Sequence, residues 1–442
     1  MMRAVMMIGL ILSTVLGIAQ SKSRMYTGLS ASSQDRFQAS NNLTPNSAVK
    51  AGFNNAASQR QGKARGEFLF PNGLRVPFNF EIVKGTNDSP VLYFLNGDER
   101  FEGGIVQQKD DSLYINLDLF GNVLVLKATG QKPGGFLRRQ DGRGQPLPVS
   151  ATLGTATRFL EKGPPPIGDV SGTYAIVFKA SDGKEEQAVA LFQQEGRKLK
   201  GTFLRITGDS RFLQGVVARD SFYLSSFIGS VPVYYRGRFT KQGKLYGEQV
   251  GARASTAFTG IQNEDASLPD PYGLTYLKNG YSSLSFSFPD ARGKPVSLKD
   301  PKYTGKVVIV TIGGTWCPNC IDEANFLAPW FDKNRERGVE IISIHYERST
   351  DTAFVRAALQ RFRERFHIHY DQLFGGLADK SAVAASLPAL NTFLSFPTTI
   401  FIDKKGKVAK IHTGYSGPAT GKYYTEFVKE FNDEVDALVK EP

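Results

Sequence analysis

The chain has 442 residues, of which 41% are hydrophobic, 12% aromatic and 22% charged, and its formal net charge is +12. This composition excludes a mainly disordered or fibrous protein, and the length predicts two or three folded domains. Lys and Arg are spread along the whole chain without a dense run. We therefore interpret the positive charge as a solubility feature and expect no nucleic-acid partner.

The first predicted element is a secretory signal over residues 1–19. Arg3 precedes an apolar run, and the small residues Gly17 and Ala19 occupy positions minus three and minus one of a cleavage site after Ala19. A membrane anchor is the weaker interpretation, because the run is shorter than the roughly 20 residues that cross a bilayer. We expect export to the periplasm or cell envelope, with no transmembrane segment after cleavage. Residues 20–64, rich in Ser, Asn, Gln and Ala, are predicted to be a flexible leader.

Two β-rich regions are predicted next, at residues 65–160 and 168–262. In the first, Leu113, Ile115 and Leu117 alternate with polar residues, which is typical of a half-buried strand. A Pro-rich link at 163–166 separates the regions as a stiff spacer.

The two β-rich regions share an order of residues that indicates an internal repeat. Gly97-Asp98-Glu99-Arg100-Phe101 matches Gly208-Asp209-Ser210-Arg211-Phe212, and an Asp-Ser pair follows each, at Asp111-Ser112 and Asp220-Ser221. We predict two copies of one antiparallel β-meander, barrel-like or sandwich-like, each hiding its apolar face. Since neither copy carries a catalytic set, we assign both to binding or placement.

A linker at 263–276 precedes a final region, 277–442, in which strands and helices alternate. Continuous apolar runs at 307–312 and 339–344 are suited to central strands covered on both faces. Helices are predicted at 319–337, 351–366 and 423–440, and a hairpin at 396–411. This order predicts a layered α/β domain with one antiparallel hairpin.

The only two cysteines, Cys317 and Cys320, lie three positions apart. Structural disulfides of exported proteins usually close longer loops, so this spacing indicates that the two cysteines have a chemical role and not a structural one. The pair lies where a buried strand ends and a helix begins, and the free N–H groups of a helix start stabilise a thiolate on the first cysteine. Cys317 is therefore the predicted nucleophile and Cys320 the residue that resolves the mixed disulfide. We expect a redox-active Cys317–Cys320 disulfide, no other cofactor and no metal.

Three motifs of the final region are specific as a set: Gly-Thr-Trp-Cys-x-x-Cys from Gly314, Glu323 three residues after Cys320, and Ser395-Phe396-Pro397-Thr398-Thr399 before an apolar strand. With them the region resembles the thioredoxin superfamily, and within it the exported TlpA/ResA-type thiol-disulfide oxidoreductases. The resemblance implies a thioredoxin fold over 277–442, a catalytic carboxyl at Glu323, and a cis proline at Pro397 facing the cysteines. The implied substrate-binding residues are Trp316, Pro318, Phe396, Pro397 and Thr398, with the Phe396 backbone pairing with an extended substrate.

The region departs from the family pattern in two places. Asn325 stands where many members have proline, and Pro329 follows four residues later, which predicts a local kink. A longer insert between Phe366 and Ser395, including 378–391, suggests a specialised groove or lid.

The leading hypothesis is an exported reductase that takes electrons from a soluble or membrane-bound thiol donor and reduces cysteines in exported proteins. The first alternative is a peroxiredoxin-like peroxidase, which the sequence disfavours because neither cysteine follows a Pro-x-x-x-Thr/Ser motif. The second is a copper-binding thioredoxin-fold module that recruits His412, or His367 and His369 from one face of a predicted strand. Glu347 is expected to be a solvated loop residue.

Overall fold

The computed structural model describes residues 62–85, 89–130, 132–159 and 163–442. The predicted signal at 1–19 and nearly all of the predicted leader at 20–64 lie outside these residues. Within the described ranges, no helix is both long enough and apolar enough to span a membrane.

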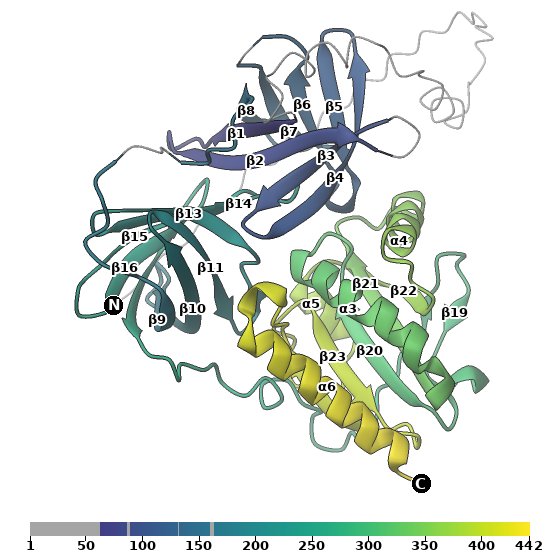
Figure 1. Ribbon diagram of the computed structural model, residues 1–442. Helices are drawn as coiled ribbons and strands as arrows, with labels where there is room; N and C mark the ends of the chain where they lie inside the picture. The colour runs from purple at the N-terminus through teal and green to yellow at the C-terminus, as the bar shows by residue number, and fades with distance from the viewer. Residues whose placement is uncertain (1–61, 86–88, 131, 160–162) are drawn as a thin grey trace, which may run out of the picture. The chain divides into compact units, whose positions relative to one another are not determined.

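The first β unit is a closed antiparallel barrel in which each strand pairs with the next and β8 pairs back with β1 (Figure 1). Its strands are β1 (Lys63–Leu69), β2 (Arg75–Lys84), β3 (Pro90–Asn96), β4 (Glu99–Lys109), β5 (Ser112–Leu117), β6 (Asn122–Lys127), β7 (Gly134–Arg139) and β8 (Leu147–Leu153). Leu113, Ile115 and Leu117 of β5 are buried, as their alternation predicts. A short 3₁₀ helix, η2 (Asp118–Phe120), links β5 to β6.

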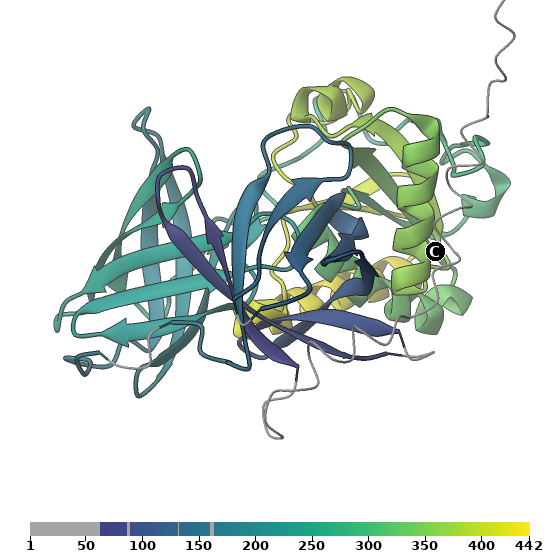
Figure 2. The same ribbon diagram turned by 90° about the horizontal axis from the view of Figure 1, so that it is seen from above.

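The second β unit also closes, because β10 pairs with β11 as well as with β9. Its strands, teal in Figure 2, are β9 (Gly172–Lys179), β10 (Glu185–Glu195), β11 (Lys198–Arg205), β12 (Gly208–Asp209), β13 (Leu213–Ala218), β14 (Ser221–Ser226), β15 (Val233–Phe239), β16 (Lys244–Val250) and β17 (Ser255–Gln262). Both Asp-Ser pairs adjoin a tight turn, with left-handed residues Asp110 (φ 54°) and Arg219 (φ 56°) before β5 and β14. The prediction of two repeated antiparallel β units is confirmed.

The two β units are joined through buried side chains. Phe227, which follows β14, packs among aromatic rings of the first barrel, with ring centroids 4.7 Å from Phe68 and 4.8 Å from Phe94. Beside it the buried Arg158 donates to the Ser225 carbonyl at 2.6 Å and to the Leu95 carbonyl. Apolar packing and a satisfied buried guanidinium therefore hold the barrels together.

The C-terminal domain is a five-stranded sheet in the order β22-β21-β20-β23-β24 with helices on both faces. The strands are β20 (Val307–Gly313), β21 (Val339–Glu347), β22 (Asp371–Leu377), β23 (Thr398–Ile402) and β24 (Val408–Thr413). The helices are α3 (Pro318–Asn334), α4 (Thr352–Phe366), α5 (Lys380–Ser386) and α6 (Lys422–Lys440). The short elements are β18 (Phe288–Pro289), β19 (Pro295–Val296), η3 (Pro301–Tyr303), η4 (Arg335–Arg337) and η5 (Pro418–Thr420).

The central strand β20 positions the site because both of its faces are covered. Ile309 packs in the core cluster that contains α3 and α6, whereas Val308 and Val310 pack in the cluster that contains α5. Every residue of β20 is buried, which explains why the run is continuously apolar. The predicted α/β thioredoxin-like domain is confirmed.

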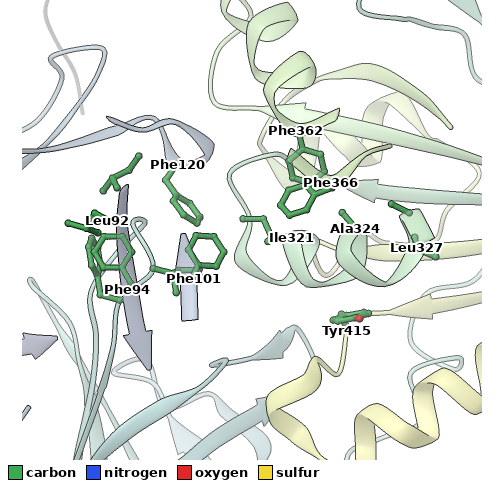
Figure 3. Close-up of a cluster of buried hydrophobic side chains, with 14 of the residues drawn as sticks. Leu92, Phe94, Phe101, Phe120, Ile321, Ala324, Leu327, Phe362, Phe366 and Tyr415 are labelled. Atoms are coloured by element: carbon green, nitrogen blue, oxygen red, sulfur yellow. The ribbon is translucent and has the colours of Figure 1, made fainter. Parts of the chain in front are cut away.

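One buried apolar cluster includes residues of both the first β unit and the C-terminal domain (Figure 3). Phe101 and Phe120 come from the barrel, while Phe362 and Phe366 come from α4, which lies against η2. Arg365 of α4 adds an ion pair of 2.6 Å with Glu102. The first barrel is thus attached to the domain that carries the cysteines by apolar packing.

Two details of the insert differ from expectation. It contains the edge strand β22, which begins at Asp371, after the histidines where a strand was predicted, and the helix α5, which was not predicted. His367 and His369 do not share a strand face, because His367 ends α4 in the left-handed conformation (φ 52°) and the next residues form a loop. The predicted strand at these histidines is therefore wrong.

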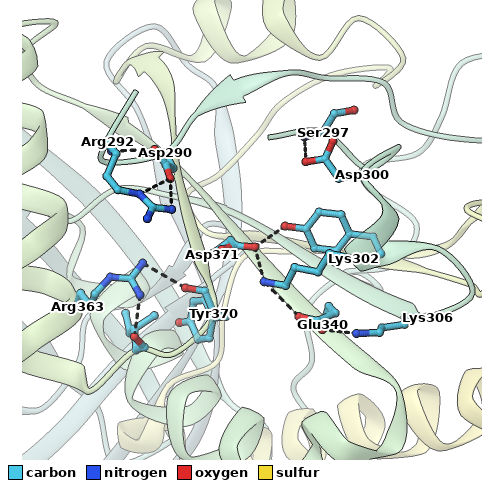
Figure 4. Close-up of polar contacts among 12 residues, drawn as sticks. Asp290, Arg292, Ser297, Asp300, Lys302, Lys306, Glu340, Arg363, Tyr370 and Asp371 are labelled. Atoms are coloured by element: carbon cyan, nitrogen blue, oxygen red, sulfur yellow. Dashed lines mark hydrogen bonds and ion pairs between the residues drawn. The ribbon is translucent and has the colours of Figure 1, made fainter. Parts of the chain in front are cut away.

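A polar network lies at the ends of the parallel strands opposite the cysteines (Figure 4). Asp371 at the start of β22 accepts from Lys302 at 2.6 Å and from the Tyr303 hydroxyl at 2.5 Å, and Lys306 pairs with Glu340 at 2.6 Å. Half-exposed pairs of this kind contribute little stability. The Lys306–Glu340 pair links the start of β20 to β21, and Asp371 links the start of β22 to η3.

Replacing Phe227 by Ala should lower the free energy of unfolding by about 3–5 kcal/mol, because it empties the centre of an aromatic cluster. The measurement is the first cooperative transition in urea. Tyr246→Ala is the control, since Tyr246 is 49% exposed and should change stability by less than about 0.5 kcal/mol. Equal effects of the two substitutions would contradict this account of how the barrels are joined.

Candidate active site

The cysteine pair lies at the start of α3, directly after β20. Cys317 is the N-cap residue of α3 and its Sγ accepts from the Cys320 N–H at 3.4 Å. Pro318 occupies the first turn, where its missing N–H costs nothing. Both thiols are free, and the residues are only 6% and 5% exposed. The helix therefore presents its unpaired N–H groups to the first sulfur, as predicted.

The proline loop faces the cysteines. The Phe396–Pro397 peptide is cis, as the resemblance implies, and Cys317 Sγ lies 3.6 Å from the Phe396 carbonyl oxygen. Thr398 Oγ1 donates to the Ser395 carbonyl at 2.8 Å and closes this loop, so the Thr398 side chain serves the loop's shape. Trp316 packs edge-on against Phe396 with ring centroids 5.6 Å apart. The predicted substrate-binding residues of the two loops thus lie together around Cys317.

Glu323 is buried one turn along α3 from Cys320. Its Oε1 accepts from Thr399 Oγ1 at 2.6 Å, and burial raises its pKa from 4.5 to about 7. Burial, together with the hydrogen bond and charge of Cys317, raises the pKa of the Cys320 thiol well above its ordinary value, and the charge of Glu323 raises it further. Because the Cys320 thiol loses its proton only at high pH, it needs a base, and a Glu323 carboxyl with a pKa near neutrality is suited to accepting that proton.

Glu347 is not the solvated loop residue that the sequence suggested. It is 1% exposed at the end of β21 and accepts from the Thr315 N–H at 2.9 Å and from Thr315 Oγ1 at 3.0 Å. Burial raises its pKa to about 7. The neighbouring Trp316 Nε1 donates to the Tyr346 carbonyl at 2.9 Å. The end of β21 therefore fixes the residues just before Cys317, through a contact between distant segments that the sequence does not signal.

The second β unit contributes a buried cation that the sequence did not place at the site. Arg211 Nη1 donates to the Pro318 carbonyl at 2.8 Å and pairs with Asp322 at 2.5 Å. Its Nη2 pairs with Glu99 of the first barrel at 2.5 Å. Burial raises the pKa of Asp322 to about 7, although the charge of Arg211 opposes the rise. Arg211 belongs to the predicted repeat, but sequence alone gives no sign of this long-range contact.

The histidines of the copper alternative do not gather at the thiols. His412 is buried, bonds through Nδ1 to the Gly414 carbonyl at 3.1 Å and packs against Tyr272. His369 pairs with Asp332 on the surface. Among the residues that the structure describes, no three His, Cys, Asp or Glu side chains are grouped as a metal site.

The C-terminal domain is similar in sequence to known proteins. Residues 278–425 match the Redoxin family model. The chain is 30% identical over 154 residues to "thiol-disulfide oxidoreductase ResA" of Bacillus thuringiensis subsp. konkukian, across 35% of this chain and 79% of that protein. It is 26% identical over 152 residues to the protein of that name from Halalkalibacterium halodurans, across 34% of this chain and 77% of the relative. The Bacillus subtilis protein is 27% identical over 142 residues, across 32% and 71%. Through its C-terminal domain, the chain belongs to the TlpA/ResA-like thiol-disulfide oxidoreductases of the thioredoxin superfamily.

Proposed function

We propose that this thiol-disulfide oxidoreductase works as a reductase of cysteines in exported proteins. The observation that carries the proposal is the position of Cys317 Sγ, 3.4 Å from the Cys320 N–H and 3.6 Å from the carbonyl before the cis proline. A thiol at a helix start beside the main chain of a cis-proline loop is suited to receiving an extended segment that contains a disulfide.

The reaction transfers two electrons in two displacements. The Cys317 thiolate attacks one sulfur of the substrate disulfide, a mixed disulfide forms, and the other substrate sulfur leaves as a thiolate that takes up a proton. The Cys320 thiolate, its proton passed to Glu323, then attacks Cys317 Sγ and releases the second substrate thiolate. The protein ends with a Cys317–Cys320 disulfide, and a dithiol donor, soluble or membrane-bound, restores the two thiols.

The roles of the remaining residues follow from their contacts. Trp316 and Pro318 would border the bound segment on the cysteine side, and Phe396 with Pro397 on the opposite side. Thr398 would keep the proline loop in shape through its bond to Ser395. The predicted signal at 1–19 supports export and a periplasmic or envelope location, where a reductase needs a dedicated supply of electrons.

The reduction potential of the Cys317/Cys320 pair should lie below about −200 mV, nearer the reductant end of a fold that spans about −270 to −120 mV. The measurement is equilibration in defined thiol-disulfide buffers, with alkylation as the readout. A value near −120 mV would make the protein a disulfide donor and overturn the direction, because a donor must have an unstable disulfide. A chain with no transition at all would not be an oxidoreductase.

Replacing either cysteine by serine should separate the two displacements. Cys317→Ser should abolish exchange with a protein disulfide, while Cys320→Ser should accumulate a mixed disulfide through Cys317, because the resolving thiol is gone. Mass spectrometry of the covalent complex is the readout. Accumulation of the complex in Cys317→Ser instead would reverse the assigned order of the cysteines.

Replacing Glu323 by Gln should slow resolution by about 10²-fold and remove its pH dependence near 7, since the amide cannot carry the proton. Because burial raises the Glu323 pKa from 4.5 to about 7, the wild type should lose stability as the pH rises through this window, and the variant should lose less. Stopped-flow kinetics and denaturation between pH 4 and 8 provide the test. Glu336→Gln is the matched control, because its side chain is exposed after the same helix; a similar slowing there would refute the assignment.

A further inference from the structure

Residues 206–211 of the second β unit, here called the cover segment, lie on the loops that surround the cysteines. Ser395 Oγ of the proline loop donates to the Thr207 carbonyl at 2.7 Å. On the loop after β24, a Cβ added to Gly414 would meet the Ile206 carbonyl oxygen at 2.3 Å. This close approach leaves no room for another chain between the segment and these loops.

The cover segment also contacts the turn that carries the cysteines. The Asn319 side-chain amide pairs with both main-chain groups of Asp209, accepting from its N–H at 2.7 Å and donating to its carbonyl at 3.2 Å. Asp209 Oδ2 accepts from the Gly417 N–H at 2.6 Å, and Arg211 reaches the Pro318 carbonyl at 2.8 Å. The proline loop, the loop after β24 and the turn that carries the cysteines therefore all bind the cover segment.

These contacts occupy the face that a protein substrate needs. The cover segment offers the main-chain groups of Thr207 and Asp209 to the side chains of Ser395 and Asn319, one on the proline loop and one on the turn that carries the cysteines. Ser395 and Pro397, on either side of Phe396, are buried although both belong to a predicted substrate-binding loop. With the segment in place, a polypeptide cannot lie across the proline loop and reach Cys317.

The attachment of the cover segment is polar, which is typical of contacts that open reversibly. The Arg211 guanidinium pairs with Glu99 and Asp322, and the Arg211 main-chain N–H donates to Asp209 Oδ1 at 2.5 Å. β12 pairs with β11 at two positions, Asp209 with Leu204 and Gly208 with Arg205, and Ser210 adds a bond from its N–H to the Phe203 carbonyl at 2.9 Å. A hairpin with so little pairing can leave locally while the barrel stays closed.

We propose that the cover segment is an autoinhibitory element that occupies the substrate-binding face and must be displaced before a protein disulfide reaches Cys317. The inference rests on the proposed function and adds its regulation. It requires local opening of the β11–β12 turn, and the rate of protein reduction then scales with the fraction of molecules that are open.

Two substitutions test the element, each with a matched control from the first repeat. Asp209→Ala and Arg211→Met remove one anchor each, whereas Asp98→Ala and Arg100→Met change the equivalent positions, whose side chains are 70% and 48% exposed. Loss of one buried anchor should raise the open fraction, and so the rate of insulin disulfide reduction, about tenfold. Exchange with oxidised glutathione should rise less, and the controls should match the wild type.

The possible outcomes distinguish failure of the autoinhibition from failure of the proposed function. A folded Asp209→Ala protein that reduces insulin at the wild-type rate or more slowly would overturn the autoinhibition. If the wild type exchanges neither insulin nor glutathione, the proposed function itself fails, which is a different result from an active enzyme that the anchor variants leave unchanged.

A second measurement leaves Asp209 and Arg211 intact. Cys320→Ser protein is trapped through Cys317 with an extended peptide that contains one cysteine, and amide hydrogen exchange is compared with the peptide-free protein. The amides of residues 208–211 should lose protection in the complex because the peptide takes their place. Unchanged protection with the peptide covalently bound would overturn the proposal.

Discussion

The structure depends on the unpaired N–H groups at the start of α3, which face the sulfur of Cys317. A thiolate needs such donors, and they exist only where a helix begins. The buried strand β20 delivers the chain to this point, and Glu347 at the end of β21 holds the Thr315 N–H and hydroxyl just before it. The proline loop then closes the site from the opposite side, 3.6 Å from the same sulfur. Core packing thus sets a geometry that the two thiols alone could not maintain.

Three buried carboxyls around this helix start share a pKa raised to about 7 by burial, yet their surroundings differ. Glu347 accepts two hydrogen bonds from Thr315 and so holds the residues just before Cys317 in place. Glu323 has one hydroxyl donor and lies toward Cys320, so its proton is available for exchange. Asp322 faces Arg211 and links the helix to the second β unit. Burial alone does not define a catalytic group; the partner of each carboxyl decides its role.

The sequence predicted those features that depend on a local pattern of residues. The apolar run at 307–312, the helices and the cysteine motif follow from periodicity and spacing, and the repeat followed from matched turn residues. Contacts between segments that are distant in the sequence could not be predicted from it. Glu347 was misjudged because β21 continues to Glu347, beyond the apolar run that ends at 344, and the strand expected at His367 failed because α4 ends there in a left-handed turn. Arg211 was noticed as part of the repeat, but its contacts with Glu99 and Asp322 bridge residues more than 100 positions apart.

The way the β units are attached limits which parts of the molecule can move. Phe227 and Arg158 join the two barrels through buried contacts, and Phe101 and Phe120 join the first barrel to α4 within an apolar cluster. Separating either pair would expose apolar surface, which costs about 25 cal/mol per Å². The cover segment, by contrast, is attached through hydrogen bonds and ion pairs. Motion that uncovers Cys317 is therefore expected at the β11–β12 turn, with both barrels remaining as a fixed frame around it.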